Sequence, residues 1–235
     1  MQSDYGKGIF NEDDQKRNLT LNRGMSGIFA LMFLGLLASA ATAYLTASIP
    51  ELRNLVFGTN LYWLFLLAPL GLVVIAFPRV WKMSAGAAFT LFFFYALING
   101  ITLGIIFLVY DLGTITLAFL SAAGMFGVMA IYGAVTKADL TKLGSLLLMG
   151  LVGIIIASLL NLLIFRSAGM DLLISYIGIA VFLGLTAYDI QRLRRSMTEY
   201  GGNAPAAVMV KGALHLYLDF LNIFLFLLRI MGRRR

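Results

Sequence analysis

The chain has 235 residues, of which 60% are hydrophobic and only 12% are charged, whereas soluble domains carry roughly 25% charged residues. With a mean hydropathy of +0.90, this composition excludes a soluble protein and indicates an integral membrane protein. The net charge of +7 comes from lysines and arginines at the ends of apolar segments, which excludes a nucleic-acid interface, and the absence of cysteine excludes disulfides and thiolate metal sites.

Apolar stretches follow one another from the end of a polar N-terminal segment. Residues 1–24 mix acidic and basic side chains and are predicted to form a mobile tail. Residues 25–235 are predicted to form one all-α membrane domain of seven transmembrane helices, because each stretch can cross a hydrocarbon core about 30 Å thick at about 1.5 Å per residue. The stretches cover residues 26–49, 61–77, 85–110, 115–135, 143–165, 172–190 and 206–231.

The cationic residues predict the orientation in the membrane. If the N-terminus is cytoplasmic, eleven lysines and arginines of the tail and loops lie on the cytoplasmic side and two on the other. The arginines after the last stretch would then lie outside, against this rule, if that stretch crosses. We still expect a crossing, because no glycine or proline interrupts residues 213–231 and a re-entrant backbone would need one. The absence of cysteine is compatible with a bacterial inner membrane.

The last stretch carries an aspartate, Asp219, near its midpoint. A carboxylate at the centre of a membrane helix costs about 2.5–3.5 kcal/mol on insertion scales, so it persists only where it faces protein or water. The other polar residues of the stretch share its helical face within roughly 80°; they are Lys211, His215, Asn222 and Arg229. We therefore predict that this helix lies at the centre of the bundle, with six helices around it.

A second carboxyl, Asp189, lies near the end of the preceding stretch. Taken alone, it is typical of an interfacial ion pair with Arg192, one helical turn further on. Together with Asp219 it suggests a carboxyl pair. Two carboxyls in close contact would titrate as one unit and sense pH, and when ionised they would bind Ca²⁺ weakly, since Ca²⁺ prefers six to eight oxygens. No other cofactor is expected.

Other polar residues are candidates for supporting roles. Asn222 could add an oxygen to the Ca²⁺ site, and His215 could share a proton with Asp219 or simply be its hydrogen-bonded partner. Arg229 could neutralise a carboxylate or extend toward the lipid head groups. Arg79 and Lys82 are either interfacial anchors or a cationic latch that holds an aspartate in a closed state.

The two aspartate motifs, GLTAYDIQRL and LYLDFLNIFLFLLRIMG, resemble the Bax inhibitor-1 family, also called the transmembrane Bax-inhibitor-motif proteins. The middle of the chain, AGMFGVMAIYGAVTKADL followed by GLVGIIIASLLNLLIF, is similar to the bacterial inner-membrane branch of that family. The resemblance runs from about Arg23 to the end. It implies six helices around a central seventh and a pH-dependent calcium leak governed by two aspartates, which match Asp189 and Asp219.

Three functions compete on this basis. The first is a non-enzymatic, pH-sensitive calcium or cation leak across the lipid bilayer. The second is a regulator that binds a membrane protease or another complex, with the aspartates holding the bundle together. The third is an intramembrane aspartyl protease, in which two carboxyls would activate water; it is disfavoured because Asp219 follows Leu216-Tyr217-Leu218 rather than a Gly-x-Gly sequence.

Overall fold

A computed structural model describes residues 3–200 and 204–232, and these residues are almost entirely helical, with no strand among them. Seven helical segments are long and apolar enough to cross a membrane, as the sequence predicts. The α-helices are α1 (Ser3–Ser48), α2 (Pro50–Phe57), α3 (Leu61–Gly71), α4 (Ala85–Leu103), α5 (Ile105–Val109), α6 (Leu112–Val135), α7 (Thr141–Leu160), α8 (Ala168–Glu199) and α9 (Ala206–Met231). Tighter or wider turns form η1 (Leu72–Ala76), η2 (Phe77–Lys82) and η3 (Asn161–Phe165).

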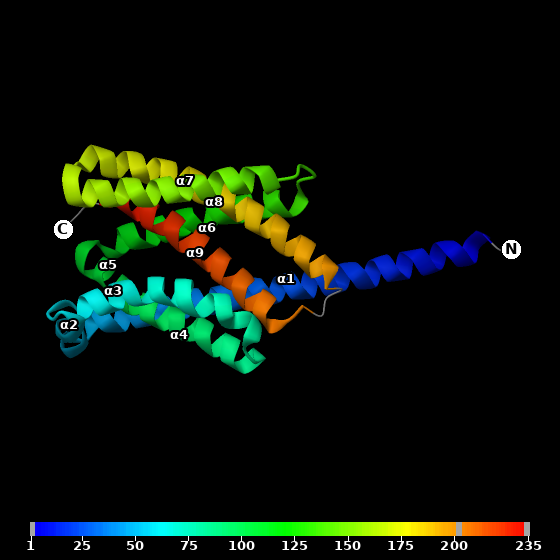
Figure 1. Ribbon diagram of the computed structural model, residues 1–235, viewed down its shortest axis with the longest axis horizontal. Coiled ribbons are helices and arrows are strands. Elements are labelled where there is room, and N and C mark those ends of the chain that lie inside the picture. Colours follow the sequence, from blue (N-terminus) through cyan, green and yellow to red (C-terminus); the bar gives the residue numbers. More distant parts are fainter. Residues whose placement is uncertain (1–2, 201–203, 233–235) are drawn as a thin grey trace.

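Two boundaries differ from the sequence-based expectation. Helix α1 begins at Ser3, so the segment expected to be a tail continues the first membrane helix toward its N-terminus (Figure 1); its mobility stays a prediction. The second span does not stop at Pro78 but continues to Lys82 through the 3₁₀ turn η2. Proline is tolerated there because it occupies the first turn, where its missing N–H has no helical acceptor.

Helix α9 is the core of the bundle. About 61% of its most apolar window is buried inside the protein, compared with 11–39% for the other six spans. It packs against α8, α6, α1 and α4, while α3 packs mainly on α4 and α7 mainly on α8. The prediction of a central seventh helix is confirmed. Figure 1 shows α9 crossing obliquely between two groups of helices, α1–α5 and α6–α8.

Glycines allow close helix contacts within each group. A side chain on Gly100 of α4 would collide with the backbone of Ser39 on α1, and a side chain on Gly133 of α6 would collide with the backbone of Ala187 on α8. Small residues at helix crossings are typical of membrane bundles, in which packing rather than hydrophobic burial holds the helices together.

Side-chain hydrogen bonds hold the loops at the two ends of the bundle in place. The Gln191 side chain on α8 accepts a hydrogen bond from Leu140 N and donates one to Ala138 O, which ties the α6–α7 loop to α8. At the opposite end, Asn161 donates to Asp171 Oδ1 at 2.7 Å. These contacts hold α7 against α8 at both ends.

Asp139 in the α6–α7 loop forms an exposed ion pair with Arg195, with 3.0 Å between Oδ1 and Nη2. Hydrogen bonds from the Thr141 side chain and backbone, and then from Arg195, lower the pKa of the Asp139 carboxyl from 3.8 to about 2. The loop contact is therefore made by an ionised carboxylate at all ordinary pH values.

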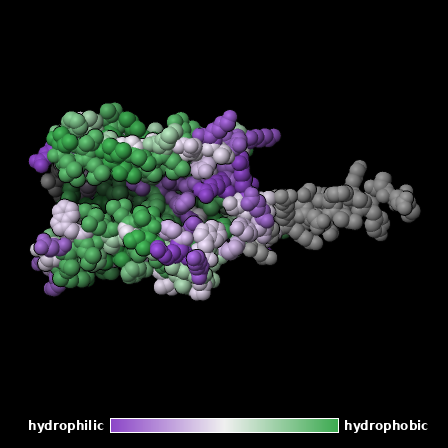
Figure 2. Space-filling model, viewed as in Figure 1, coloured by the Kyte–Doolittle hydropathy of each residue, from purple (hydrophilic) through white to green (hydrophobic). Residues whose placement is uncertain are grey.

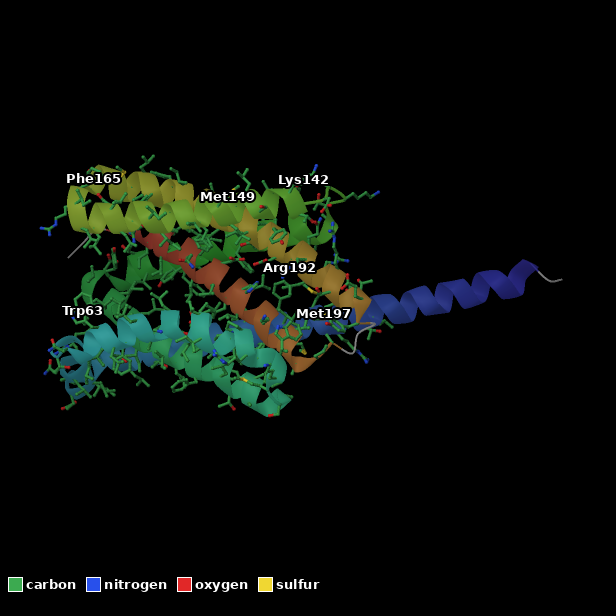
Figure 3. The ribbon with its side chains drawn as sticks, in the orientation of Figure 1. Trp63, Lys142, Met149, Phe165, Arg192 and Met197 are labelled. Carbon is green, nitrogen blue, oxygen red and sulfur yellow. The ribbon has the colours of Figure 1, made fainter. Side chains whose placement is uncertain are left out.

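The surface divides into an apolar belt and polar ends. Figure 2 shows hydrophobic residues covering both helix groups, and hydrophilic residues gathered toward the end from which α1 projects. Lys142, Arg192 and Met197 lie toward that end in Figure 3, while Trp63 and Phe165 lie at the other. We call the former the basic end, because it carries the cationic side chains of η2, the α6–α7 loop and the second half of α8.

Candidate functional site

The two predicted aspartates lie at the interface of α8 and α9, the most extensive helix contact in the described part of the chain. Asp189 on α8 and Asp219 on α9 are both buried, with 8% and 4% of their surfaces exposed. Their carboxyl groups are near enough to interact electrostatically. The structure thus brings together the two carboxyls that the sequence suggested as a pair.

Asp189 lies beside a histidine and at the inner end of a cavity. Its Oδ2 is 3.5 Å from Nδ1 of His215, a contact between α8 and α9. The cavity, of about 170 Å³, lies toward the basic end and is lined by both residues. The His215 side chain is 43% exposed and that of Asp189 is 12% exposed, so solvent in the cavity reaches the histidine first.

This geometry corrects two expectations about partners. Taken alone, Asp189 was typical of an ion pair with Arg192, but within the described residues its ion-pair partner is His215. His215 was expected to share a proton or a hydrogen bond with Asp219 on its own helix. Its ring instead contacts the carboxyl of Asp189 on the neighbouring helix. Arg192 lines the cavity without forming an ion pair with Asp189 in the part of the chain that the structure describes.

Asp219 lies behind this pair, away from the cavity. Its Oδ2 is fully buried and has no hydrogen-bond partner among the described residues. A buried polar atom without a partner costs about 1–3 kcal/mol, and more if it is charged, so folding stability does not explain this carboxyl. The cavity therefore reaches only one member of the carboxyl pair, because its lining includes Asp189 and not Asp219.

Apart from His215, the supporting residues on α9 form no hydrogen bond or ion pair with the carboxyl pair within the described residues. The Asn222 amide donates to Leu218 O at 2.8 Å, one turn back on the same helix. Arg229 lies over the ring of Phe226, with 5.6 Å from Cζ to the ring centroid, and is exposed. Ten residues separate it from Asp219, about 15 Å along the helix. Of the two roles considered for Arg229, the structure favours extension toward the lipid head groups.

The predicted latch residues are exposed on η2 and do not line the cavity. Arg79 donates to Ile75 O within its own segment, and Lys82 is exposed. The cations that do line it are Arg192 and Lys211, and Lys211 Nζ lies 4.9 Å from the ring centroid of Trp81. The available sequence signal for Lys211 was its place one helical turn before His215 on the polar face.

A buried hydrogen-bond cluster around Tyr217 was missed by the sequence analysis. The Tyr217 hydroxyl is 2.6 Å from Ser39 Oγ on α1 and accepts from Asn99 Nδ2 on α4 at 2.9 Å. Ser39 also donates to Ala96 O at 2.7 Å. The cluster fastens α9 to the α1–α4 group, on the side of the helix away from the carboxyl pair.

The donor set fits a cation in transit better than a resident metal ion. No group of three or more histidine, aspartate or glutamate side chains suited to a metal is present among the described residues. Two carboxyls supply at most four oxygens, and the Asn222 amide, whose nitrogen donates to Leu218 O, has one more in its Oδ1. Because Ca²⁺ takes six to eight oxygens, the rest of its ligands here would have to be water.

Comparisons with known proteins agree with the fold. The family model described as "Inhibitor of apoptosis-promoting Bax1" matches residues 21–235. The inner membrane protein YbhL of Escherichia coli K12 is 40% identical over 216 residues, which cover 90% of this chain and 92% of YbhL. An uncharacterized protein of Borreliella burgdorferi is also 40% identical, over 94% of this chain and 97% of its own length. A membrane protein of Streptococcus pyogenes is 37% identical, over 91% and 93%.

Proposed function

Because the chain belongs to the Bax inhibitor-1 family of integral membrane proteins, we propose that it is a pH-sensitive leak for Ca²⁺ or similar cations, gated by Asp189 and Asp219. No enzymatic step is part of the proposal. One observation supports it most: a buried carboxyl oxygen of Asp219 without a hydrogen bond lies behind a second carboxyl that lines a cavity.

The cavity provides the entrance for the cation. It lies toward the basic end and is lined by two acidic residues of α8: Glu199, which is nearer that end, and Asp189, which is buried at the interface with α9. Asp219 is buried and does not line the cavity, so we assign this arrangement to a closed state. A carboxyl pair that titrates as one unit would make opening depend on pH.

The side of the membrane to which the cavity opens follows from the charges of the loops. The proposed orientation puts the N-terminus and the basic end in the cytoplasm, because most lysines and arginines outside the spans lie there. The cavity then opens toward the cytoplasm. The protein would be located in the bacterial inner membrane, by analogy with the relative named for that membrane.

The alternative of an intramembrane aspartyl protease receives no support from the geometry. That reaction needs a water molecule between two carboxyls. Here the cavity reaches only Asp189.

Calcium flux through the purified protein in liposomes tests the proposal. Liposomes loaded with a calcium indicator should take up Ca²⁺ in a pH-dependent way when they contain the protein, and Asp189→Asn and Asp219→Asn should reduce that flux to the level of empty liposomes. Asp171→Asn is the matched control, because this aspartate also lies on α8 but at its other end. Unchanged pH-dependent flux in both Asn variants would rule out the gate and favour a structural role for the aspartates.

A further inference from the structure

One line of side chains on the central helix is left uncovered by its neighbours. Between Val210 and Arg229, every residue of α9 is buried except six. Those six fall within an arc of about 80° at 100° per residue, so they form a single line along the helix. We call them the open line of α9: Lys211, His215, Leu218, Asn222, Leu225 and Arg229.

The open line is uncovered because the two helix groups do not close over it. Helix α4 packs on α1 and helix α8 packs on α6 and α7, but α4 and α8 make no substantial contact with each other within the described residues. Figure 2 shows the resulting furrow between the two hydrophobic groups, with hydrophilic residues inside it. We call it the α4–α8 furrow. Its edges are apolar and lie within the span that hydrocarbon covers.

The side chains of the open line carry positive charge and would attract an anionic group. Lys211 and Arg229 stand at its two ends, His215 and Asn222 lie between them, and it contains no acidic residue, since Asp219 is buried beside α8. A row that is cationic at both ends attracts phosphate, which arginine can bind through two parallel hydrogen bonds. At the basic end the furrow shares Lys211 and His215 with the cavity described above, whereas the line from Leu218 to Arg229 lies outside the lining of that cavity.

The length of the open line matches the membrane. Eighteen residues separate Lys211 from Arg229, which is about 27 Å of helix, close to the thickness of about 30 Å of the hydrocarbon core. Each cation thus lies near the level of one layer of head groups. A molecule using the whole furrow must offer a phosphate to the line and an apolar part to the surrounding hydrocarbon, and both belong to a phospholipid.

We propose that the α4–α8 furrow takes phospholipids with their phosphate against the open line and their acyl chains in the bilayer, and so lets head groups pass between the two leaflets. Without such a path a head group must give up its hydrogen bonds in hydrocarbon, which costs several kcal/mol for each polar group. The transfer needs no energy source, because it only equilibrates lipid between leaflets.

Lipid transfer can be measured in vesicles of phosphatidylcholine and phosphatidylglycerol that contain tail-labelled fluorescent phosphatidylglycerol. Dithionite added outside should bleach nearly all of the label when the full-length protein is present, and only the outer leaflet when it is absent. Asn222→Leu should slow the transfer by about tenfold, the factor expected when one polar interaction in the membrane is lost. Its folding is checked by size-exclusion chromatography and its calcium flux is measured in parallel.

A substitution that should speed lipid transfer distinguishes a change in the furrow from a loss of folding. Leu225 lies in the open line, so Leu225→Asn should speed the transfer, whereas Leu146→Asn makes the same change on the exposed outer face of α7 and should leave the rate unchanged. Bleaching limited to the outer leaflet with the folded wild-type protein would overturn the proposal. So would equal rates in wild type, Asn222→Leu and Leu225→Asn. Neither result depends on whether the protein conducts Ca²⁺.

Discussion

Replacing Asp219 with leucine should make the protein more stable. Its Oδ2 is buried without a hydrogen bond, and the neighbouring Asp189 carboxyl adds an unfavourable interaction when both are ionised. An unpartnered buried polar group costs about 1–3 kcal/mol, and replacing buried charges with apolar residues of similar volume is often stabilising by about 1–4 kcal/mol. We therefore expect Asp219→Leu to raise the free energy of unfolding by about 1–3 kcal/mol while abolishing calcium flux.

Reversible unfolding in mixed detergent micelles, followed by circular dichroism, measures this change. Asp171→Leu is the matched comparison, because Asp171 accepts a 2.7 Å hydrogen bond from the buried Asn161 amide, which the substitution leaves with only one of its two acceptors, Ser167 O. It should lower the free energy of unfolding by about 1–3 kcal/mol. If Asp219→Leu were as destabilising as Asp171→Leu, then Asp219 would hold the bundle together and the reasoning from its unpartnered oxygen would be wrong.

Other predictions concern the parts of the fold that position the carboxyl pair. Tyr217→Phe should lower the free energy of unfolding by about 1–3 kcal/mol, because the Asn99 amide loses its acceptor; an unchanged detergent unfolding curve would contradict this. Gly133→Ala should lower it by about 1–3 kcal/mol through collision with α8, whereas Gly127→Ala on the same helix meets open space and should raise it slightly. The Asp139 carboxyl has a pKa lowered from 3.8 to about 2 on folding, so its contribution to stability is complete above the ordinary value and lost as the pH falls to about 2. Carbon-13 NMR of this carboxyl should show the titration, and a midpoint near the ordinary value would refute the loop contact.

Much of the fold could be predicted because membrane helices follow simple rules. Apolar length alone located the seven spans, and the polar face around Asp219 indicated the central position of α9, since a charged residue at that depth must avoid lipid. The extension of the second span to Lys82 was missed because Pro78 is a helix-breaking signal in general. Only the three-dimensional structure shows that it occupies the first turn of a 3₁₀ segment.

The candidate site was predictable in its residues but not in its contacts. Spacing along a helix predicts partners on the same helix, so it paired His215 with Asp219 and Asp189 with Arg192. The observed partner of Asp189 is His215, on the neighbouring helix. Such contacts depend on the rotation and height of two packed helices. The Tyr217 cluster escaped notice for the same reason, because it joins residues of three different helices.

The central position of α9 has a consequence for how the protein is made. Helices α1 to α8 leave the ribosome before α9, so both helix groups must enter the membrane while the helix that joins them is still missing. Until it arrives, Ser39 and Asn99 lack the Tyr217 hydroxyl, and Asp189 lacks its histidine. Assembly is therefore completed late in biogenesis, and a chain interrupted before residue 206 would leave two helix groups that contact each other mainly through α1 with α8 and α5 with α6, a target for membrane quality control.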